Sequence, residues 1–223
     1  MDRKRIIVVG FKGKMGSLIF ERLKRLGFDV VGVDLEDDIN LVAHADLVVD
    51  FASAKSSVQS ALWCKNHRTS LIVGATGQTD EELKIIESAS QKVAVCKAGN
   101  FSVGVAKMKQ MLKLFEETRI DDCVVFEKHH KNKIDSPSGT AKELKSILEN
   151  VTHKDVQVLC ERGGKEIGTQ VVDFYFGDEL LSVKHQAFSR DAFVDGVIVA
   201  VQFMLKNKEI GMFDFENILM QKA

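Results

Sequence analysis

The segment from residue 6 to residue 34 restricts the fold more than any other part of the sequence. An apolar run at residues 6–9 predicts a buried strand, and glycines at positions 10, 13 and 16 follow it directly. Apolar residues then recur at helical spacing up to Gly27, and a second apolar run at residues 30–33 ends in Asp34. A strand, a glycine turn, a helix, a second strand and an acid in this order are typical of a βαβ unit that binds a dinucleotide.

Each part of this pattern has a chemical reason. Glycines let the backbone approach a pyrophosphate, the helix N-terminus stabilises its charge, and the acid binds ribose hydroxyls. The spacing is G-x-x-G-x-x-G rather than G-x-G-x-x-G, so an ordinary tight turn is the alternative. The helix, strand and acid favour the nucleotide. We therefore predict nucleotide contacts from Gly10, Lys12, Gly13, Lys14, Met15, Gly16 and Asp34.

The acid also bears on cofactor choice. A carboxylate at Asp34 would repel a 2′-phosphate, and Leu35 supplies no arginine to offset it, so NADH is favoured. Lys12 and Lys14 could reach a phosphate, and NADPH therefore remains open as a second cofactor.

Three further apolar runs, at residues 47–49, 71–73 and 93–96, alternate with helical patterns, one of them opened by a capping box of Thr79 and Glu82. This alternation predicts a Rossmann-like doubly wound parallel sheet in a dinucleotide-binding domain at residues 1–100. Ligands bind at the carboxyl ends of such strands. The cofactor-binding residues expected there are Phe51, Ser53, Gly74, Ala75, Thr76, Ala98, Gly99, Asn100 and Phe101. Of these, Ser53, Thr76 and residues 98–101 are expected on the nicotinamide side. For each of them alone, a structural role in a turn is the alternative.

The pattern changes after Asn100. A helical stretch and then strand-like runs, near residues 123–126, 156–160, 170–176 and 180–188, predict an α+β substrate domain at residues 101–188 with a mostly antiparallel open sheet. The open face suits self-association. Residues 161–168 read as a flexible glycine loop. A helix after Ser189, within residues 189–223, is expected to complete the first domain.

The chemical groups gather between residues 127 and 141. His129 and His130 follow a strand, and Thr140 with Glu143 reads as a capping box for a helix at residues 141–149. Amides at the start of that helix favour an anion such as a carboxylate. A solvated basic turn is the alternative, but Pro137, Gly139 and the capped helix together favour a site.

Composition narrows the partners. The 31 basic and 32 acidic residues nearly balance, so we expect a small-molecule partner rather than nucleic acid or a membrane. No apolar run approaches about 18 residues, and the charged N-terminus leads directly into a strand, so a soluble cytoplasmic protein is expected. The 4 cysteines are far apart, which predicts buried free thiols and no metal site.

With these residues in view, the chain resembles the dihydrodipicolinate reductase family, also called 4-hydroxy-tetrahydrodipicolinate reductases, over almost its whole length. The most specific element is E-x-H-H-x-x-K-x-D-x-P-S-G-T-A, from Glu127 to Ala141. Five other motifs follow the family's order: G-x-x-G-x-M-G from Gly10, Asp50-Phe51, G-x-T-G from Gly74, N-F-S-x-G-V from Asn100 and S-R-x-x-F from Ser189.

The resemblance implies an NAD(P)H-dependent reductase in the diaminopimelate route to lysine, in which His129 donates or accepts a proton and Lys133 donates one. It implies a cyclic dicarboxylate substrate held by His130, Lys133, Ser138, Gly139 and Thr140, and a homotetramer formed through the substrate-domain sheets. The chain departs from the family at Ala106, where asparagine is usual, and at Gln170, where histidine is usual. It is also shorter than many members after Asp34, which bears on cofactor selectivity.

Two other hypotheses remain at this stage. A non-catalytic nucleotide-binding sensor would not need the proton donors His129 and Lys133. Another small-substrate dehydrogenase would not require the Ser-Pro-Ser-Gly-Thr segment. Hydrolase chemistry is weaker, because Ser138 does not lie in a G-x-S-x-G elbow.

Overall fold

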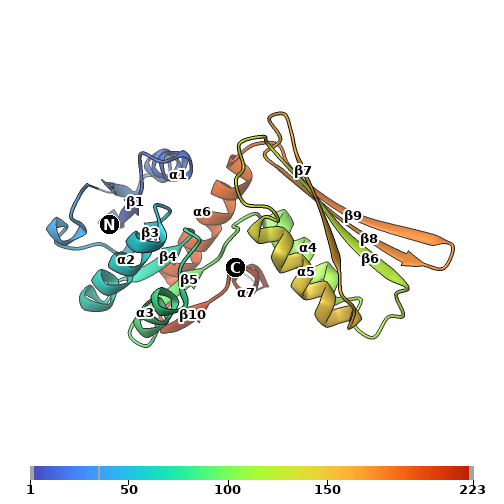
Figure 1. The fold of residues 1–223 in the computed structure, drawn as a ribbon. Helices are drawn as coiled ribbons and strands as arrows, with labels where there is room; N and C mark the ends of the chain where they lie inside the picture. Colours follow the sequence, from blue (N-terminus) through green and yellow to red (C-terminus); the bar gives the residue numbers. More distant parts are fainter. Residues whose placement is uncertain (1–2, 35, 221–223) are drawn as a thin grey trace. The chain divides into compact units, whose positions relative to one another are not determined.

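The computed structural model describes residues 3–34 and 36–220. Leu35, which entered the argument about cofactor choice, lies outside the described residues. The chain forms two compact units, which are Met1–Phe101 with Phe193–Ala223 and Ser102–Ala192 (Figure 1). Each unit has its own sheet.

The first unit contains a six-stranded parallel sheet in the order β10-β5-β4-β3-β1-β2. Its strands are β1 (Arg5–Val9), β2 (Asp29–Val33), β3 (Leu47–Asp50), β4 (Ser70–Val73), β5 (Ala94–Lys97) and β10 (Gly211–Phe213). The chain passes from β1 to β2 on one side and returns to β3 on the other. The predicted doubly wound sheet is confirmed, and its topological switch point lies at the carboxyl ends of β1 and β3.

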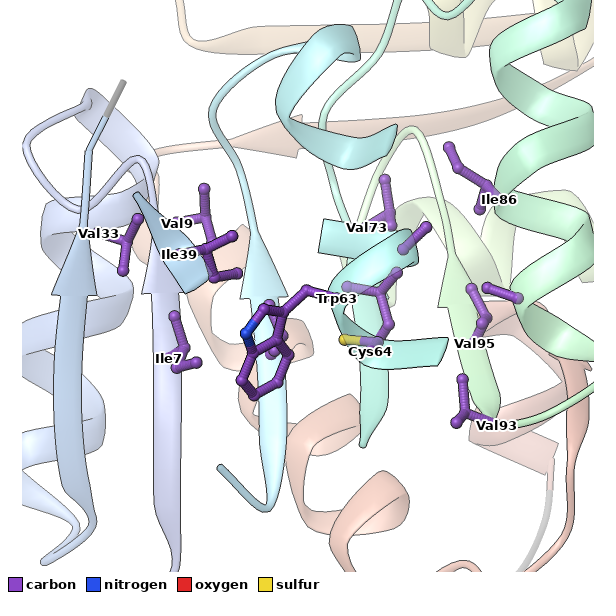
Figure 2. Packing of buried hydrophobic residues seen from close by; sticks show 14 residues of the cluster. Ile7, Val9, Val33, Ile39, Trp63, Cys64, Val73, Ile86, Val93 and Val95 are labelled. Carbon is purple, nitrogen blue, oxygen red and sulfur yellow. The ribbon is translucent and has the colours of Figure 1, made fainter. Parts of the chain in front are cut away.

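Helices cover both faces of this sheet. They are α1 (Lys14–Arg25), α2 (Ala54–His67), α3 (Asp80–Ser90), α6 (Asp191–Lys206) and α7 (Phe215–Met220), with a short 3-10 helix η1 (Ile39–Leu41). Under α2 and α3, Trp63 and Ile86 pack with Ile7, Val73 and Val95 of the strands (Figure 2). Helix α6 runs behind the strands in the same view, and Arg22 of α1 pairs with Asp195 of α6 at 2.5 Å. The predicted capping box of Thr79 and Glu82 is confirmed.

The second unit contains a four-stranded sheet in the order β7-β6-β8-β9. Its strands are β6 (Asp122–His129), β7 (Gln157–Arg162), β8 (Gly168–Phe176) and β9 (Glu179–Ala187). The β6–β7 pair is parallel and the other two pairs are antiparallel, as expected for a mostly antiparallel sheet. Helices α4 (Val103–Lys113) and α5 (Gly139–Thr152) pack on one face over a buried cluster that includes Leu112, Leu144, Val125 and Phe174. The opposite face of the sheet carries no helix among the described residues.

Three expectations about this unit were wrong. Helix α5 begins at Gly139 with Ser138 as its N-cap, and Glu143 pairs with Lys109 instead of forming a capping box with Thr140. The glycine loop is shorter than predicted, because Glu161 and Arg162 belong to β7. Cys160 is exposed on that strand, whereas Cys64, Cys96 and Cys123 are buried.

Candidate active site

The centre of the candidate active site is Glu127, a carboxylate with no exposed surface at the end of β6. Its Oε1 accepts hydrogen bonds from the Ser138 amide at 2.9 Å and from Nη2 of Arg162 at 2.6 Å. Burial alone would raise the pKa of this carboxyl, but the contacts with His129, Ser138 and Arg162 hold it well below its usual range. Glu127 is therefore ionised at neutral pH.

His129 lies beside the second oxygen of this carboxylate. Its Nδ1 is 3.2 Å from Oε2 of Glu127, which is an ion-pair distance, and its side chain is 9% exposed. On the other side of the ring, a Cβ added to Gly168 would lie 3.1 Å from Nε2. Because residue 168 is a glycine, it places no side chain in the space beside Nε2.

Lys133 follows on the loop after β6. Its Nζ donates to Asp135 at 2.8 Å, and its side chain is 24% exposed. Burial favours the neutral form of Asp135, but the lysine outweighs it and lowers the pKa of that carboxyl. Arg162 reaches the same loop, because its Nη2 also donates to the carbonyl of Asp135 at 2.8 Å.

The residues of the predicted anion site fall at the start of α5. Gly139 and Thr140 are its first residues, and amides of a first helical turn have no acceptor within the helix. The hydroxyl of Ser138 accepts from the Ala141 amide at 3.2 Å, so this side chain is used as the cap. The backbone of His130 is fixed by another segment, since its amide donates to the carbonyl of Glu166 at 2.7 Å.

The two departures from the family pattern lie in buried positions. Ala106 of α4 is 1% exposed. Gln170 pairs with Glu127 across the β6–β8 ladder, and its Oε1 lies 3.2 Å from Nδ1 of His185. Nε2 of His185 in turn lies 3.1 Å from the hydroxyl of Ser102, the N-cap of α4. Gln170 thus occupies a hydrogen-bonded position next to the site.

In the first unit, the glycine turn fits a pyrophosphate. Helix α1 begins at Lys14 with Gly13 as N-cap and no side chain capping it, so its first amides can bind an anion. A Cβ at Gly16 would lie 2.0 Å from the carbonyl oxygen of Gly10, and Gly10 has a φ of +80°. Only glycine suits these two positions. Of the other residues predicted to contact the nucleotide, Lys12 lies on the same turn and Met15 is the second residue of α1.

Asp34 directly follows β2, at the carboxyl edge of the sheet. A cavity of about 280 Å³ adjoins it, lined also by Val9, Ser53, Lys55 and Gln59. The side chain of Asp34 is 20% exposed, and its Oδ2 lies 3.5 Å from Nζ of Lys12. A carboxylate beside a polar cavity at this edge fits a ribose.

The remaining predicted nucleotide residues follow the ends of β3, β4 and β5. Several are occupied by structural contacts. Ser53 caps α2 in a capping box with Ser56. Phe51 fills the space beside Gly74, and its ring lies 5.6 Å from that of Phe101, which is 2% exposed. Ala75 is also buried, whereas Thr76 and Gly99 are exposed and Ala98 and Asn100 are half-buried.

Sequence reasoning missed three polar groups, two in the second unit and one in the first. Glu127 was part of the motif but had no predicted role. Arg162 was placed in a flexible loop, although it belongs to β7 and reaches Glu127. Asp50 is fully buried at the end of β3, where it accepts from Ser56 at 2.9 Å and Ser60 at 2.7 Å; burial raises the pKa of this carboxyl. A buried acid at a strand end was the available signal for Glu127 and Asp50.

Among residues 3–34 and 36–220, no group of 3 or more His, Cys, Asp or Glu side chains could hold a metal ion. In the same part of the chain, no helix is both long and apolar enough to cross a membrane.

A doubly wound sheet with an open glycine turn, joined in one chain to a buried carboxylate–histidine pair and a lysine, defines a two-domain nucleotide-dependent oxidoreductase. The model of dihydrodipicolinate reductase, N-terminus, matches residues 4–101, and that of its C-terminus matches residues 102–219. The chain belongs to the dihydrodipicolinate reductase family. Membership implies a nicotinamide dinucleotide cofactor.

Individual relatives agree with this family. The 4-hydroxy-tetrahydrodipicolinate reductase of Thermosipho africanus is 34% identical over 95% of this chain and 96% of its own length. That of Clostridium tetani is 31% identical over 96% of each chain. A dipicolinate-bound dihydrodipicolinate reductase from Paenisporosarcina sp. has the same fold, with a TM-score of 0.78 and 21% identity over 97% of this chain and 100% of that one.

Proposed function

We propose that this chain catalyses the NAD(P)H-dependent reduction of 4-hydroxy-tetrahydrodipicolinate to tetrahydrodipicolinate, a step of the diaminopimelate route to lysine in the cytoplasm. The observation that carries the proposal is the buried pair of Glu127 and His129 on β6. Lys133 follows on the next loop, and the start of α5 comes directly after that loop. These groups occur in a chain that matches both halves of the family.

The substrate is a cyclic dicarboxylate, so it needs donors for two carboxylates. The amides of Gly139 and Thr140 suit one carboxylate, because the helix N-terminus favours negative charge. His130 and Lys133 suit the other, through charge-assisted hydrogen bonds. The relative that was solved with dipicolinate bound supports a ligand of this shape. In this proposal Ser138 contributes by capping α5.

A nicotinamide, when bound, would supply a hydride to the substrate ring once the 4-hydroxyl has left as water. The ring must then gain a proton, and His129 and Lys133 are the groups of this chain that can donate it. General acid assistance of this kind is typically worth about 10²–10⁴-fold in rate. Burial of Glu127 and near-complete burial of His129 keep this proton away from bulk water.

For the cofactor, we propose NADH as the favoured nucleotide with NADPH as a second one. Asp34 supports NADH, since a carboxylate repels a 2′-phosphate. Lys12, 3.5 Å from Asp34, offsets part of that repulsion. The remaining contacts are proposed for the glycine turn, Lys14, Met15 and the residues after β3, β4 and β5.

We also propose a homotetramer built through the open sheet face of the second unit. An apolar row crosses three strands on this face, because Phe126 of β6 pairs with Leu159 of β7 and with Val171 of β8. Leu159 is 45% exposed and Leu180 of β9 is 57% exposed. Light scattering should give a tetramer, and Leu159→Lys should lower the mass; a monomeric wild type would contradict this assembly.

The direct test of the activity is nucleotide oxidation by the purified chain in the presence of freshly made dihydrodipicolinate synthase product. Oxidation that depends on this product is expected, and it should be faster with NADH than with NADPH. If both nucleotides bind but neither is consumed, the sensor hypothesis replaces the reductase.

A further inference from the structure

We propose that Glu127 is a positioning residue, whose carboxylate holds the ring of His129 with a proton on Nδ1 and so makes Nε2 the atom that exchanges a proton with the substrate. The inference rests on the proposed function and adds to it the reacting atom and the group that selects it.

The carboxylate is fixed from several directions. Its Oε1 accepts from the amide of Ser138, at the start of α5, and from Arg162 of β7. These two donors leave Oε2 for His129, which stands two residues further along β6. Glu127 has no exposed surface, so water does not compete for either oxygen. Rotation of the carboxylate would break both hydrogen bonds at once.

An ionised carboxylate can only accept hydrogen bonds, and this requires a proton on the facing nitrogen. Nδ1 and Oε2 lie 3.2 Å apart, and neither has a well-aligned hydrogen bond to another described residue. The χ2 torsion of histidine is soft, so a small ring rotation aligns Nδ1–H with Oε2. Nε2 of the neutral ring is then free to accept a proton, and in the imidazolium form it carries the proton that is donated, on the side where Gly168 leaves space.

Arg162 extends the same arrangement to Lys133. Its Nη2 donates to Glu127 and to the carbonyl of Asp135, and Asp135 holds the ammonium of Lys133. One buried carboxylate is thereby connected to both proton donors of the proposed reaction. The positive charge of Arg162 also offsets the cost of burying Glu127.

The tautomer can be measured without any activity assay. In protein labelled with ¹⁵N-histidine, the neutral form of His129 should carry its proton on Nδ1, with its signals identified by their loss in His129→Gln. In Glu127→Gln the tautomer should reverse. Ser138 and Arg162 both donate to the retained oxygen, so the new amide group faces Nδ1 and donates to it. A wild-type ring with its proton on Nε2 would overturn the proposal.

Kinetics provide the second readout. Glu127→Gln should lower kcat by about 10²-fold and leave KM within about threefold, because the substrate contacts remain. Glu143→Gln is the matched control: it removes an acid of α5 that pairs with Lys109 of α4 and has no role in the proposed site, so it should leave kcat unchanged. A Glu127→Gln variant with wild-type kcat, or with a loss confined to KM, contradicts the positioning role. An inactive wild type with the predicted tautomer would instead contradict the proposed function.

Discussion

The amide of Ser138 donates to Oε1 of Glu127 at 2.9 Å, so the carboxylate that faces His129 also fixes the first turn of α5. The Ser138 hydroxyl serves the helix separately, by accepting from the Ala141 amide. A backbone contact thus links Glu127, the neighbour of the proposed proton-transfer residue His129, to the proposed carboxylate site, and a side-chain contact stabilises the helix that carries this site.

Ser138→Ala separates these two contacts. It removes the cap but keeps the amide, so the free energy of unfolding should fall by about 1 kcal/mol while KM for the substrate stays close to that of wild type. Urea unfolding and steady-state kinetics measure the two effects. A large rise in KM with unchanged stability would show that the hydroxyl binds the substrate directly.

Gly168→Ala tests the space beside Nε2 of His129. The added Cβ would lie 3.1 Å from this nitrogen, closer than an ordinary contact. We expect kcat to fall about tenfold or more, since small misplacements of a reacting group are costly. Gly163→Ala is the control, because its Cβ would meet only an oxygen of Glu161 at 3.9 Å. Equal kinetics in the two variants would argue against proton exchange at Nε2.

Lys133→Ala should leave NADH binding nearly intact, because the residues proposed to bind the nucleotide lie in the other unit. Turnover should fall by about 10²–10⁴-fold if the lysine donates a proton. Lys131→Ala removes a charge from the same loop and should have little effect. Binding is measured by nucleotide fluorescence and turnover by absorbance. Normal turnover in Lys133→Ala would remove this residue from the mechanism.

Asp34→Asn addresses cofactor selectivity. Removing the carboxylate should raise the ratio of NADPH to NADH efficiency by about tenfold, which corresponds to about 1.4 kcal/mol of relieved repulsion. Comparison of kcat/KM for the two nucleotides gives the ratio. Glu36→Gln, an exposed acid two residues away, controls for the general loss of charge. The same ratio in both variants would mean that Asp34 does not select the cofactor.

His185 should make stability depend on pH near neutrality. Burial lowers the pKa of this histidine below its ordinary value of about 6.5, so the unfolded chain takes up a proton at a higher pH than the folded one. The contribution of His185 to the free energy of unfolding is present above about pH 6.5, and it is lost as the pH falls through the lower pKa of the folded state. Urea unfolding at decreasing pH should therefore show a smaller loss of stability in His185→Gln than in wild type. Equal losses would place the effect on other groups.

Much of the fold could be predicted because its signals are local. The βαβ pattern from Ile6 to Asp34 fixed the parallel sheet, and the capping box of Thr79 placed α3. Strand β10 was missed because three residues, Gly211–Phe213, carry no periodicity; pairing with β5 alone defines them.

The errors around the site have one physical cause, which is contacts between distant segments. Ser138 and Thr140 are both good helix caps by residue type. Glu127, eleven residues earlier, decides between them by binding the Ser138 amide. Arg162 reaches Glu127 only because β7 lies parallel to β6, with Arg162 beside His129. Neither the register nor the buried ion pair can be read from local patterns.

The central claim is that this chain delivers a hydride from a nicotinamide to a cyclic dicarboxylate. The most direct measurement uses nicotinamide nucleotide deuterated at the transferred C4 position, the synthase product as substrate, and mass spectrometry of the product. The account predicts that tetrahydrodipicolinate forms and carries the deuterium. Nucleotide oxidation without deuterium in that product, or no oxidation with folded protein, would contradict it.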